Sequence, residues 1–267
     1  GPLVTRTLTA KEFYADGLAL IDSGDYRSAA RHFNLFTQRY ADDVQRGDAE
    51  FMAAYALQLT PPEPRAMAVN AYREAQTDFA RFIERNPGHE KSARAQTLIG
   101  ILHYRTGNYS EAVELLSDPS LRQSDPGGFL PALRALARAY AAQSDIDNAH
   151  LTFLRIVDLE ENIAPNDDYI ELASMYLSLV KGSDDERMNR HYLTQATELW
   201  DRAIRTPSLL SVHRRELVAL RDYTLGQLSG RSGGVEDSAN QESTPDASED
   251  TDAPLDLDSL RLPDDTP

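Results

Sequence analysis

Two stretches of the sequence superpose without a gap, and this internal repetition constrains the fold more than any other feature. In the first stretch Gly17 is followed seven positions later by Gly24-Asp25-Tyr26. In the second, Gly100 is followed seven positions later by Gly107-Asn108-Tyr109. Both copies continue with an alanine and then with large apolar residues. Self-similarity of this kind indicates a chain that uses one supersecondary unit several times.

Five copies of the unit follow one another in phase over about residues 10–207. One alanine marks each copy, and consecutive alanines are 46, 37, 37 and 47 residues apart. They are Ala29, Ala75, Ala112, Ala149 and Ala196. The two wider spacings predict insertions in the turns of the second and fifth copies, around residues 60–64 and 182–189.

Each copy is predicted to be a pair of helices, because apolar residues recur at i, i+3, i+4 and i+7, as in Leu133, Leu136, Ala137 and Tyr140. Small residues let the two helices of a pair approach closely, and they are Gly17, Ala54, Gly100, Ala137 and Ala173 in the first helices. A last amphipathic segment, Leu209 to Leu228, is expected to cap the array. We therefore predict an all-α chain.

This helix–turn–helix unit resembles the tetratricopeptide repeat, whose period is about 34 residues. The resemblance implies a right-handed α-α superhelix of about five helix pairs plus a C-terminal capping helix. Within this superfamily the stretch from Tyr72 to Leu116 is similar to the BamD-like and YbgF-like envelope proteins. The shared pattern is a Phe-rich helix, an Asn-Pro stop, a His and then the next repeat. This likeness implies a periplasmic or envelope-associated location and a role such as outer membrane assembly.

Charge divides the chain near residue 230. Of the net charge of −16, residues 231–267 carry −9, because they hold eleven acidic and two basic side chains. They also contain four prolines and no aromatic residue, so they cannot bury enough apolar surface to offset the entropy of ordering. We predict a lead-in at residues 1–9, a solenoid domain at 10–229 and a disordered acidic tail at 230–267. The acidity argues against nucleic acid as a partner.

Both ends of the chain carry a further expectation. Gly1 and Pro2 are typical of the scar of a cleaved expression tag, so a native signal peptide or lipid anchor is expected to have preceded Leu3. Near the other end, leucines alternate with acidic residues and form a candidate docking motif that folds on a partner. These leucines are Leu255, Leu257, Leu260 and Leu262. The alternative is an ordinary solubilising tail in which the leucines are incidental.

The sequence carries no motif for catalysis or metal binding. It has no cysteine, and its six histidines show no metal-ligand spacing. Phosphate-binding loops, dinucleotide fingerprints and nucleophile elbows are also missing, and the Gly-rich stretch from Leu225 to Gly234 is interpreted as a linker. No apolar run is long enough to span a membrane. We predict a protein with no cofactor, no metal and no enzyme activity.

The resemblance implies that the first helix of each unit lines a concave, peptide-binding surface. The expected inward positions form an aromatic and aliphatic strip that ends in two arginines, which would pair with a carboxylate of the peptide. They are Tyr14, Leu18, Phe51, Tyr55, Thr97, Ile101, Tyr104, Arg134 and Arg138. The alternative is that some of them pack against the next unit. The Lys and Asn positions of chaperone-binding tetratricopeptide domains do not match, so that specificity is disfavoured.

Three functions stay open at this point. The first is a non-catalytic scaffold or adaptor of the bacterial cell envelope, whose partners are peptide segments of other proteins or a membrane-associated complex. The second is a cytoplasmic adaptor or co-chaperone of the same fold. The third is a regulatory subunit of an enzyme complex.

Overall fold

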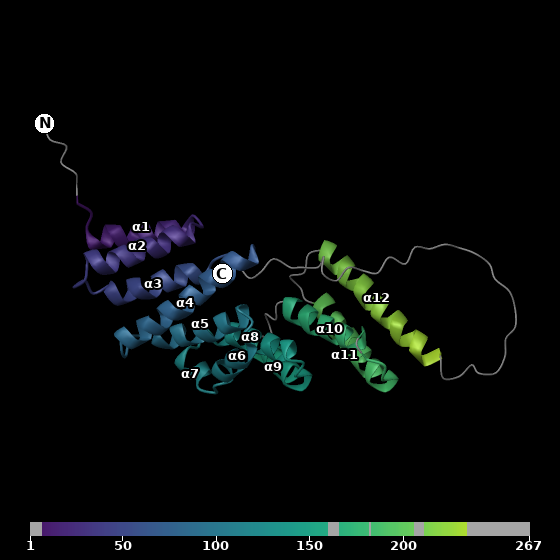
Figure 1. The fold of residues 1–267 in the computed structure, drawn as a ribbon. Coiled ribbons are helices and arrows are strands. Elements are labelled where there is room, and N and C mark those ends of the chain that lie inside the picture. Colours follow the sequence, from purple (N-terminus) through teal and green to yellow (C-terminus); the bar gives the residue numbers. More distant parts are fainter. Residues whose placement is uncertain (1–6, 160–165, 182, 206–210, 234–267) are drawn as a thin grey trace. The chain divides into compact units, whose positions relative to one another are not determined.

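The structure is a computed structural model that describes residues 7–159, 166–181, 183–205 and 211–233 (Figure 1). Over these residues the chain is all-α, as predicted, and contains no strand. It divides into two compact units, residues 1–152 and 153–267. The candidate docking leucines and all other tail residues from 234 onward lie outside the described residues.

Unit 1 is built from consecutive helix pairs. Its elements are α1 (Ala10–Asp22), α2 (Tyr26–Arg39), α3 (Arg46–Gln58), α4 (Arg65–Arg85), α5 (Ser92–Arg105), α6 (Tyr109–Leu116), the single-turn α7 (Leu121–Ser124) and α8 (Phe129–Ala142). Each helix from α1 to α5 packs against its successor, and α8 packs against both α5 and α6. The next helix, α9 (Ile146–Leu159), crosses the division between the units.

Unit 2 contains α10 (Asn166–Lys181), α11 (Glu186–Ile204) and α12 (Ser211–Gly233). The helix α11 packs against both α10 and α12. Its Trp200 is fully buried, and α12 buries Leu217 and Leu220. The predicted amphipathic segment is therefore a helix that packs against α11.

The small residues at the helix crossings have the role that the repeat pattern predicts. A Cβ added to Gly17 would lie 2.7 Å from Cζ of the buried Phe33, and one added to Gly100 would lie 2.6 Å from Cδ2 of Leu116. No side chain fits at these distances unless the neighbour moves. The first and second helices of these pairs therefore touch through the glycines.

The turns within the pairs use the left-handed backbone region. Gly24 has φ 79° and its counterpart Gly107 has φ 86°. In the third of these matching turns the positive φ, 61°, belongs to Ser144. A serine adopts this conformation less readily than glycine, because its Cβ crowds the backbone.

The expected insertion around residues 60–64 lies between α3 and α4, as predicted, whereas the one around residues 182–189 is helical from Glu186 onward. The added residues of these two copies also lengthen their second helices. Ala29 is the fourth residue of α2, but its counterparts Ala75 and Ala196 are the eleventh residues of α4 and α11. These two helices therefore begin about two turns earlier. In α4 the added turns bury Ala68 and Ala71, and helix-forming residues that also bury a face extend a helix readily.

The stretch from Leu225 to Gly234 was predicted to be a linker. This prediction is wrong for residues 225–233, which are the last turns of α12, and Gly234 lies outside the described residues. Gly226 and Gly230 each reduce helix stability by about 1 kcal/mol relative to alanine. No proline interrupts the segment, however, and the buried Thr224 and partly buried Leu228 extend the packed face of the helix.

Candidate functional site

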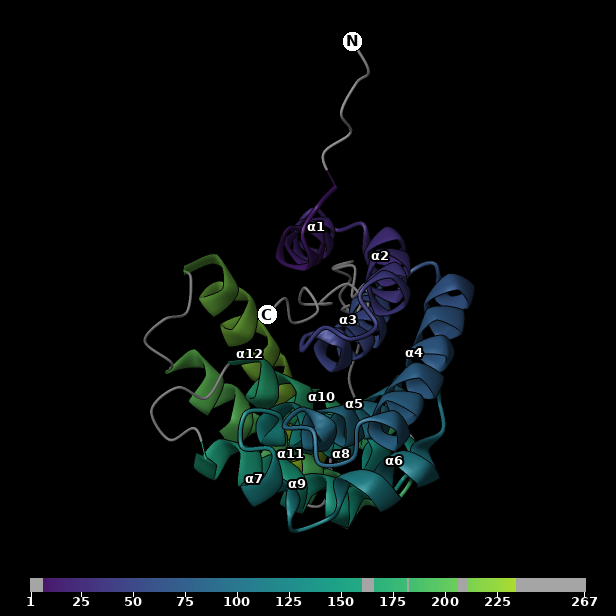
Figure 2. The same cartoon turned by 90° about the vertical axis from the view of Figure 1, so that its left-hand side faces the viewer.

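The candidate site is the face that the first helices of unit 1, α1, α3, α5 and α8, form together; we call it the first-helix face. Figure 2 shows α1 and α3 along one side of the N-terminal pairs and α2 and α4 along the other. Arg105 of α5 joins α5 to α3, because its Nη1 donates a hydrogen bond to the carbonyl oxygen of Gln58 at 3.0 Å. Phe13 of α1 shares a buried cluster with Ala49 and Ala53 of α3, and α8 packs directly against α5, so the four helices follow one another.

Four of the predicted groove residues are partly accessible on this face. Leu18 of α1 has 39% of its surface exposed. Tyr14 of α1, Tyr55 of α3 and Tyr104 of α5 are partly buried. Tyr14 packs edge-on against Phe33 with ring centroids 5.2 Å apart, so its position is fixed by the core of its own pair.

Phe51 is buried, which contradicts its prediction as an exposed groove residue. The ring of Tyr55 stacks on it at 5.9 Å, and the ammonium group of Lys91 lies 5.4 Å from its centroid. On its inner side it contacts Phe79 and Phe82 of α4. Phe51 is thus core, and Tyr55 and Lys91 present the accessible surface at this point.

Thr97 and Ile101 are also buried, so their prediction as peptide contacts is wrong as well. Both lie on α5, which packs against α4, α6 and α8. The Thr97 hydroxyl donates a hydrogen bond to the carbonyl oxygen of Ala93 at 3.1 Å. A helix that has three neighbours leaves little of its surface for a ligand.

Arg134 and Arg138 lie four residues apart on α8 and are partly buried. Both already take part in interactions within the chain. Their predicted pairing with a peptide carboxylate stays a prediction.

An ion pair joins α3 to the loop before α5. Asp48 Oδ1 lies 2.9 Å from the ammonium of Lys91 and 3.5 Å from Nε2 of His89.

Burial raises the pKa of Tyr14 to about 12, and the nearby charge of Asp48 adds to this effect. The Tyr14 hydroxyl is therefore a neutral hydrogen-bonding group at the edge of the first-helix face.

A second ion pair joins α5 to the loop before α8. Nε of Arg94 lies 2.9 Å and 2.8 Å from the two carboxylate oxygens of Asp125. The Gly128 N–H donates to Asp125 Oδ1 at 3.1 Å. Burial works to raise the pKa of Asp125, but the hydrogen bonds from Arg94, Thr97 and Gly128 and the charge of Arg94 outweigh burial and lower it. Only 6% of Asp125 is exposed.

These two ion pairs were missed at the level of the sequence, although a signal for one exists. Asp125 begins the run Asp-Pro-Gly-Gly, which is typical of a turn whose first side chain bonds the following backbone. The pairs occupy the same register, because Asp48 and Arg94 both lie six residues before the small residue of their helix, Ala54 or Gly100. Their charges are reversed between the two copies.

Among the described residues, no cluster of His, Asp and Glu side chains is arranged to hold a metal ion. Within the same ranges, none of the helices combines the length and the apolar composition that crossing a membrane requires. The chemistry of the first-helix face is therefore that of aromatic and aliphatic contacts beside compensated charges.

Consecutive helix pairs that touch through small residues and share a continuous first-helix face are typical of a helical repeat protein. Residues 64–120, which span α4, α5 and α6, match the tetratricopeptide repeat family. The predicted resemblance to the tetratricopeptide repeat is confirmed over this segment. Proteins of this family are in general non-catalytic scaffolds for protein–protein interaction.

Two solved structures of MamA support the same fold. The chain is similar to MamA, residues 41 to the end, from Desulfovibrio magneticus RS-1, with a TM-score of 0.52, 18% identity and coverage of 71% of this chain and 94% of that one. A MamA RS-1 ArsTM double mutant has a TM-score of 0.51 and 18% identity, with coverage of 71% of this chain and 93% of that one. A thermophilic TPR protein in Thermus thermophilus has a TM-score of 0.47 and 18% identity, with coverage of 81% of this chain and 99% of that one. No curated protein matches this chain.

Proposed function

We propose that this protein is a non-catalytic adaptor of the bacterial cell envelope that binds peptide segments of partner proteins on the first-helix face. One observation carries the proposal. Leu18, Tyr14 and Tyr55 stay partly accessible on neighbouring first helices, while the residues beneath them form the core. Aromatic and aliphatic side chains held by a rigid scaffold are suited to grip an extended or helical peptide.

The charges on this face favour a mainly apolar ligand. Lys91, which lies over the ring of Phe51, and Arg94 of α5 are both already paired, with Asp48 and Asp125. A peptide carboxylate would have to compete with these partners, and exposed ion pairs contribute only about 0–1 kcal/mol. We therefore expect the affinity to come from apolar anchors in the partner.

A matched pair of substitutions tests this assignment, because two leucines with nearly equal exposure lie on different helices. Leu18 on α1 is 39% exposed and Leu115 on α6 is 41% exposed. Peptides are selected from a displayed random library on the full chain, and their Kd is measured by fluorescence anisotropy. Leu18→Glu is expected to weaken binding by more than about tenfold, because one buried leucine contributes about 1.5–3 kcal/mol.

The variant Leu115→Glu is the control and should change Kd by less than about twofold, since a surface substitution away from the contact usually stays within about 0.5 kcal/mol. If both variants bind equally well, or if Leu115→Glu loses binding and Leu18→Glu does not, the first-helix face is not the binding surface. Far-UV circular dichroism of both variants separates lost binding from lost folding.

The envelope location rests on the likeness of the stretch from Tyr72 to Leu116 to the BamD-like and YbgF-like proteins. The test is fractionation of the source cells, with the protein expressed from its native gene. Recovery in the periplasmic or membrane fraction supports the proposal. Recovery in the cytosol alone contradicts it and favours the cytoplasmic adaptor or a regulatory subunit.

A further inference from the structure

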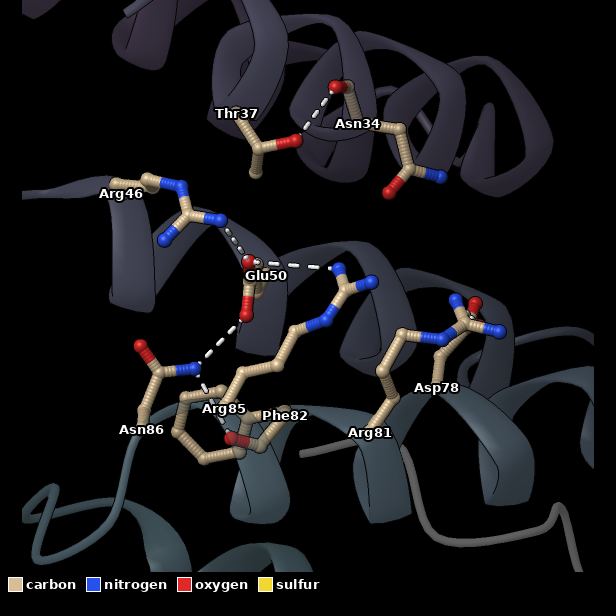
Figure 3. Close-up of polar contacts among 9 residues, drawn as sticks. All are labelled: Asn34, Thr37, Arg46, Glu50, Asp78, Arg81, Phe82, Arg85 and Asn86. Carbon is tan, nitrogen blue, oxygen red and sulfur yellow. Dashed lines mark hydrogen bonds and ion pairs between the residues drawn. The ribbon is translucent and has the colours of Figure 1, made fainter. Parts of the chain in front are cut away.

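A second surface of unit 1 lies between α2 and α4 and is lined by arginine side chains. Figure 3 shows Asn34 of α2 at one border and Arg81 and Arg85 of α4 at the other, with Arg46 and Glu50 of α3 between them. We call it the arginine surface. Nothing in the proposed function uses these residues.

At the arginine surface, solvent meets the guanidinium groups before it meets their carboxylate partners. Nη2 of Arg46 lies 3.1 Å from Glu50 Oε1, and Nη1 of Arg85 lies 4.0 Å from the same atom. The Glu50 side chain is only 11% exposed, whereas that of Arg85 is 56% exposed. Nη1 of Arg81, whose side chain is 49% exposed, donates to Asp78 Oδ1 at 3.0 Å, and the Asp78 side chain is 16% exposed. The arginines therefore keep N–H donors for a ligand.

The charges of the arginine surface are not balanced. The helix α2 contains three arginines and no acidic residue, and α4 contains four arginines and three acidic residues. One of these acids, Glu74, pairs with Arg27 of α2 at 2.6 Å, so the two helices form one surface. Arg31 lies one turn after Arg27 on the exposed side of α2. This excess of positive charge belongs to a chain whose net charge is −16.

An exposed leucine lies beside these arginines. Leu35 of α2 is 53% exposed, and it follows Arg31 by four residues, so the two side chains lie on the same face of the helix. A ligand for this surface can therefore combine negative charge with an apolar side chain. A peptide offers both, whereas the phosphate backbone of a nucleic acid offers charge alone.

We propose that the arginine surface binds an acidic peptide segment of a partner protein. Carboxylates of the segment pair with Arg31, Arg81 and Arg85, and an apolar side chain of the segment packs on Leu35. Guanidinium groups suit this role, because their fixed fork of donors matches both oxygens of a carboxylate. Nucleic acid fits less well, because the net charge of −16 repels a dense polyanion.

The arginine surface selects a different ligand from the first-helix face, so the proposal goes beyond the proposed function. On the first-helix face Lys91 and Arg94 each have a carboxylate partner of their own, at 2.9 Å and 2.8 Å. At the arginine surface Arg46 and Arg85 share the single carboxylate of Glu50. An acidic segment therefore gains more at the arginine surface, and an apolar peptide gains more at the first-helix face. An adaptor with both surfaces holds two partners of different chemistry.

The experiment measures the Kd of labelled peptides for the full chain by fluorescence anisotropy. The probe is a synthetic peptide of aspartate and glutamate residues with one central leucine, and its matched control carries asparagine and glutamine in place of the acids. Only the acidic peptide is expected to bind. Its affinity should fall by more than about tenfold between about 0.1 M and about 1 M salt, because the Debye length shortens from about 10 Å to about 3 Å.

Charge reversal locates the binding surface. Arg81→Glu with Arg85→Glu should weaken binding of the acidic peptide by more than about tenfold, because both charge-assisted hydrogen bonds are lost. The control, Arg65→Glu with Arg73→Glu, makes the same change of net charge elsewhere on α4 and should change Kd by less than about threefold at about 0.1 M salt. The neutral variant Arg81→Gln with Arg85→Gln should also weaken binding, and it replaces the first variant if circular dichroism shows that charge reversal disturbs folding.

A second substitution tests the apolar contact. Leu35→Ala should weaken binding of the acidic peptide by about threefold or more, because it removes part of the apolar area that the peptide covers. The same substitution should leave Kd unchanged for an acidic peptide whose leucine is replaced by glycine. This comparison isolates the contact between the two leucines.

Four results would overturn the proposal. The first is an acidic peptide that binds no better than its amide control. The second is equal weakening in the Arg65 and Arg73 control, which means that net charge alone attracts the peptide. The third is a Kd that Leu35→Ala leaves unchanged, and the fourth is equally tight binding of a single-stranded DNA oligonucleotide of the same charge. The Arg81 and Arg85 variants should keep their affinity for peptides that bind the first-helix face, so these outcomes are separate from the proposed function.

Discussion

Replacing Asp125 by asparagine tests how much the ion pair between α5 and the loop before α8 contributes to the stability of unit 1. The substitution keeps the size of the side chain and leaves an oxygen that accepts the hydrogen bond of the Gly128 N–H. It removes the negative charge that Arg94 contacts through both oxygens. The change therefore affects one ion pair and creates no cavity.

The expected loss is about 2 kcal/mol in the free energy of unfolding of unit 1. A hydrogen bond to a charged group contributes about 1.5–3 kcal/mol, and breaking a buried pair costs about 3–5 kcal/mol. The Arg94 side chain is 40% exposed, so water replaces part of what it loses and the lower range applies. In urea, with a slope of about 1–3 kcal/mol per molar, the midpoint should fall by roughly 1 M.

The assay is urea unfolding followed by far-UV circular dichroism, with Asp22→Asn as the control. Asp22 is an exposed residue of α1, and a surface change of this kind stays within about 0.5 kcal/mol. Hydrogen exchange measured by mass spectrometry adds the location, because protection should decrease first in α5 and α8, which the ion pair joins.

The pH dependence gives the result that would refute this reasoning. The pKa of Asp125 is lowered in the folded chain from its ordinary value of 3.8, so its contribution is present above pH 3.8 and is lost as the pH falls through the lower, folded value. The stability difference between wild type and Asp125→Asn must therefore shrink below about pH 4. A difference that stays constant or grows as the pH falls to about 2 contradicts the ion pair, as does a midpoint equal to that of Asp22→Asn.

Two further predictions concern single residues. Gly17→Ala should destabilise unit 1 by about 1–2 kcal/mol, because the new methyl group overlaps the buried ring of Phe33. Gly226 has open space around it, so Gly226→Ala should stabilise α12 by about 1 kcal/mol. Thermal unfolding checks both substitutions, which should shift Tm in opposite directions. Tyr14 has a raised pKa of about 12, so its contribution to stability is present below about pH 10 and is lost as the pH rises through about 12. Ultraviolet titration should show a late-ionising tyrosine that Tyr14→Phe removes, and an unchanged titration curve contradicts the assignment.

The repeat pattern was sufficient to predict the helix pairs and their contacts. Gly17 and Gly100 were identified as close-approach positions from their spacing to the following Gly-Asp-Tyr and Gly-Asn-Tyr turns, and both contact the partner helix as expected. Such contacts are determined within a short stretch of chain. Local periodicity therefore carries the information that places them.

The lengths of α4 and α11 were not predictable from the repeat spacing alone. The excess residues between marker alanines fit a longer loop and a longer helix equally well. The choice depends on whether the added residues find a surface to bury. Ala68 and Ala71 do so in α4, and this is a tertiary fact that the spacing does not contain.

The accessible part of the candidate site was predicted only in part, for a related reason. Register predicted Tyr14, Leu18 and Tyr55 as accessible positions of the first helices, and all three are partly accessible. It did not reveal that Tyr55 and Lys91 cover Phe51, because Lys91 comes from a loop 40 residues further along the chain. Coverage by distant segments decides whether an inward position is surface or core.

The reversed polarity of the two ion pairs makes the order of the helix pairs matter. Units that share a period are in principle interchangeable, and deleting one whole pair leaves the periodicity intact. If α5 and α6 were removed together with the loop that precedes them, Asp48 of α3 would face Asp125 of the loop before α8, and two carboxylates would meet where each now has a cation. Like charges in such a position repel. A shortened array would therefore be less stable at the new contact between α3 and the loop before α8. The two ion pairs thus favour the order in which the helix pairs follow one another.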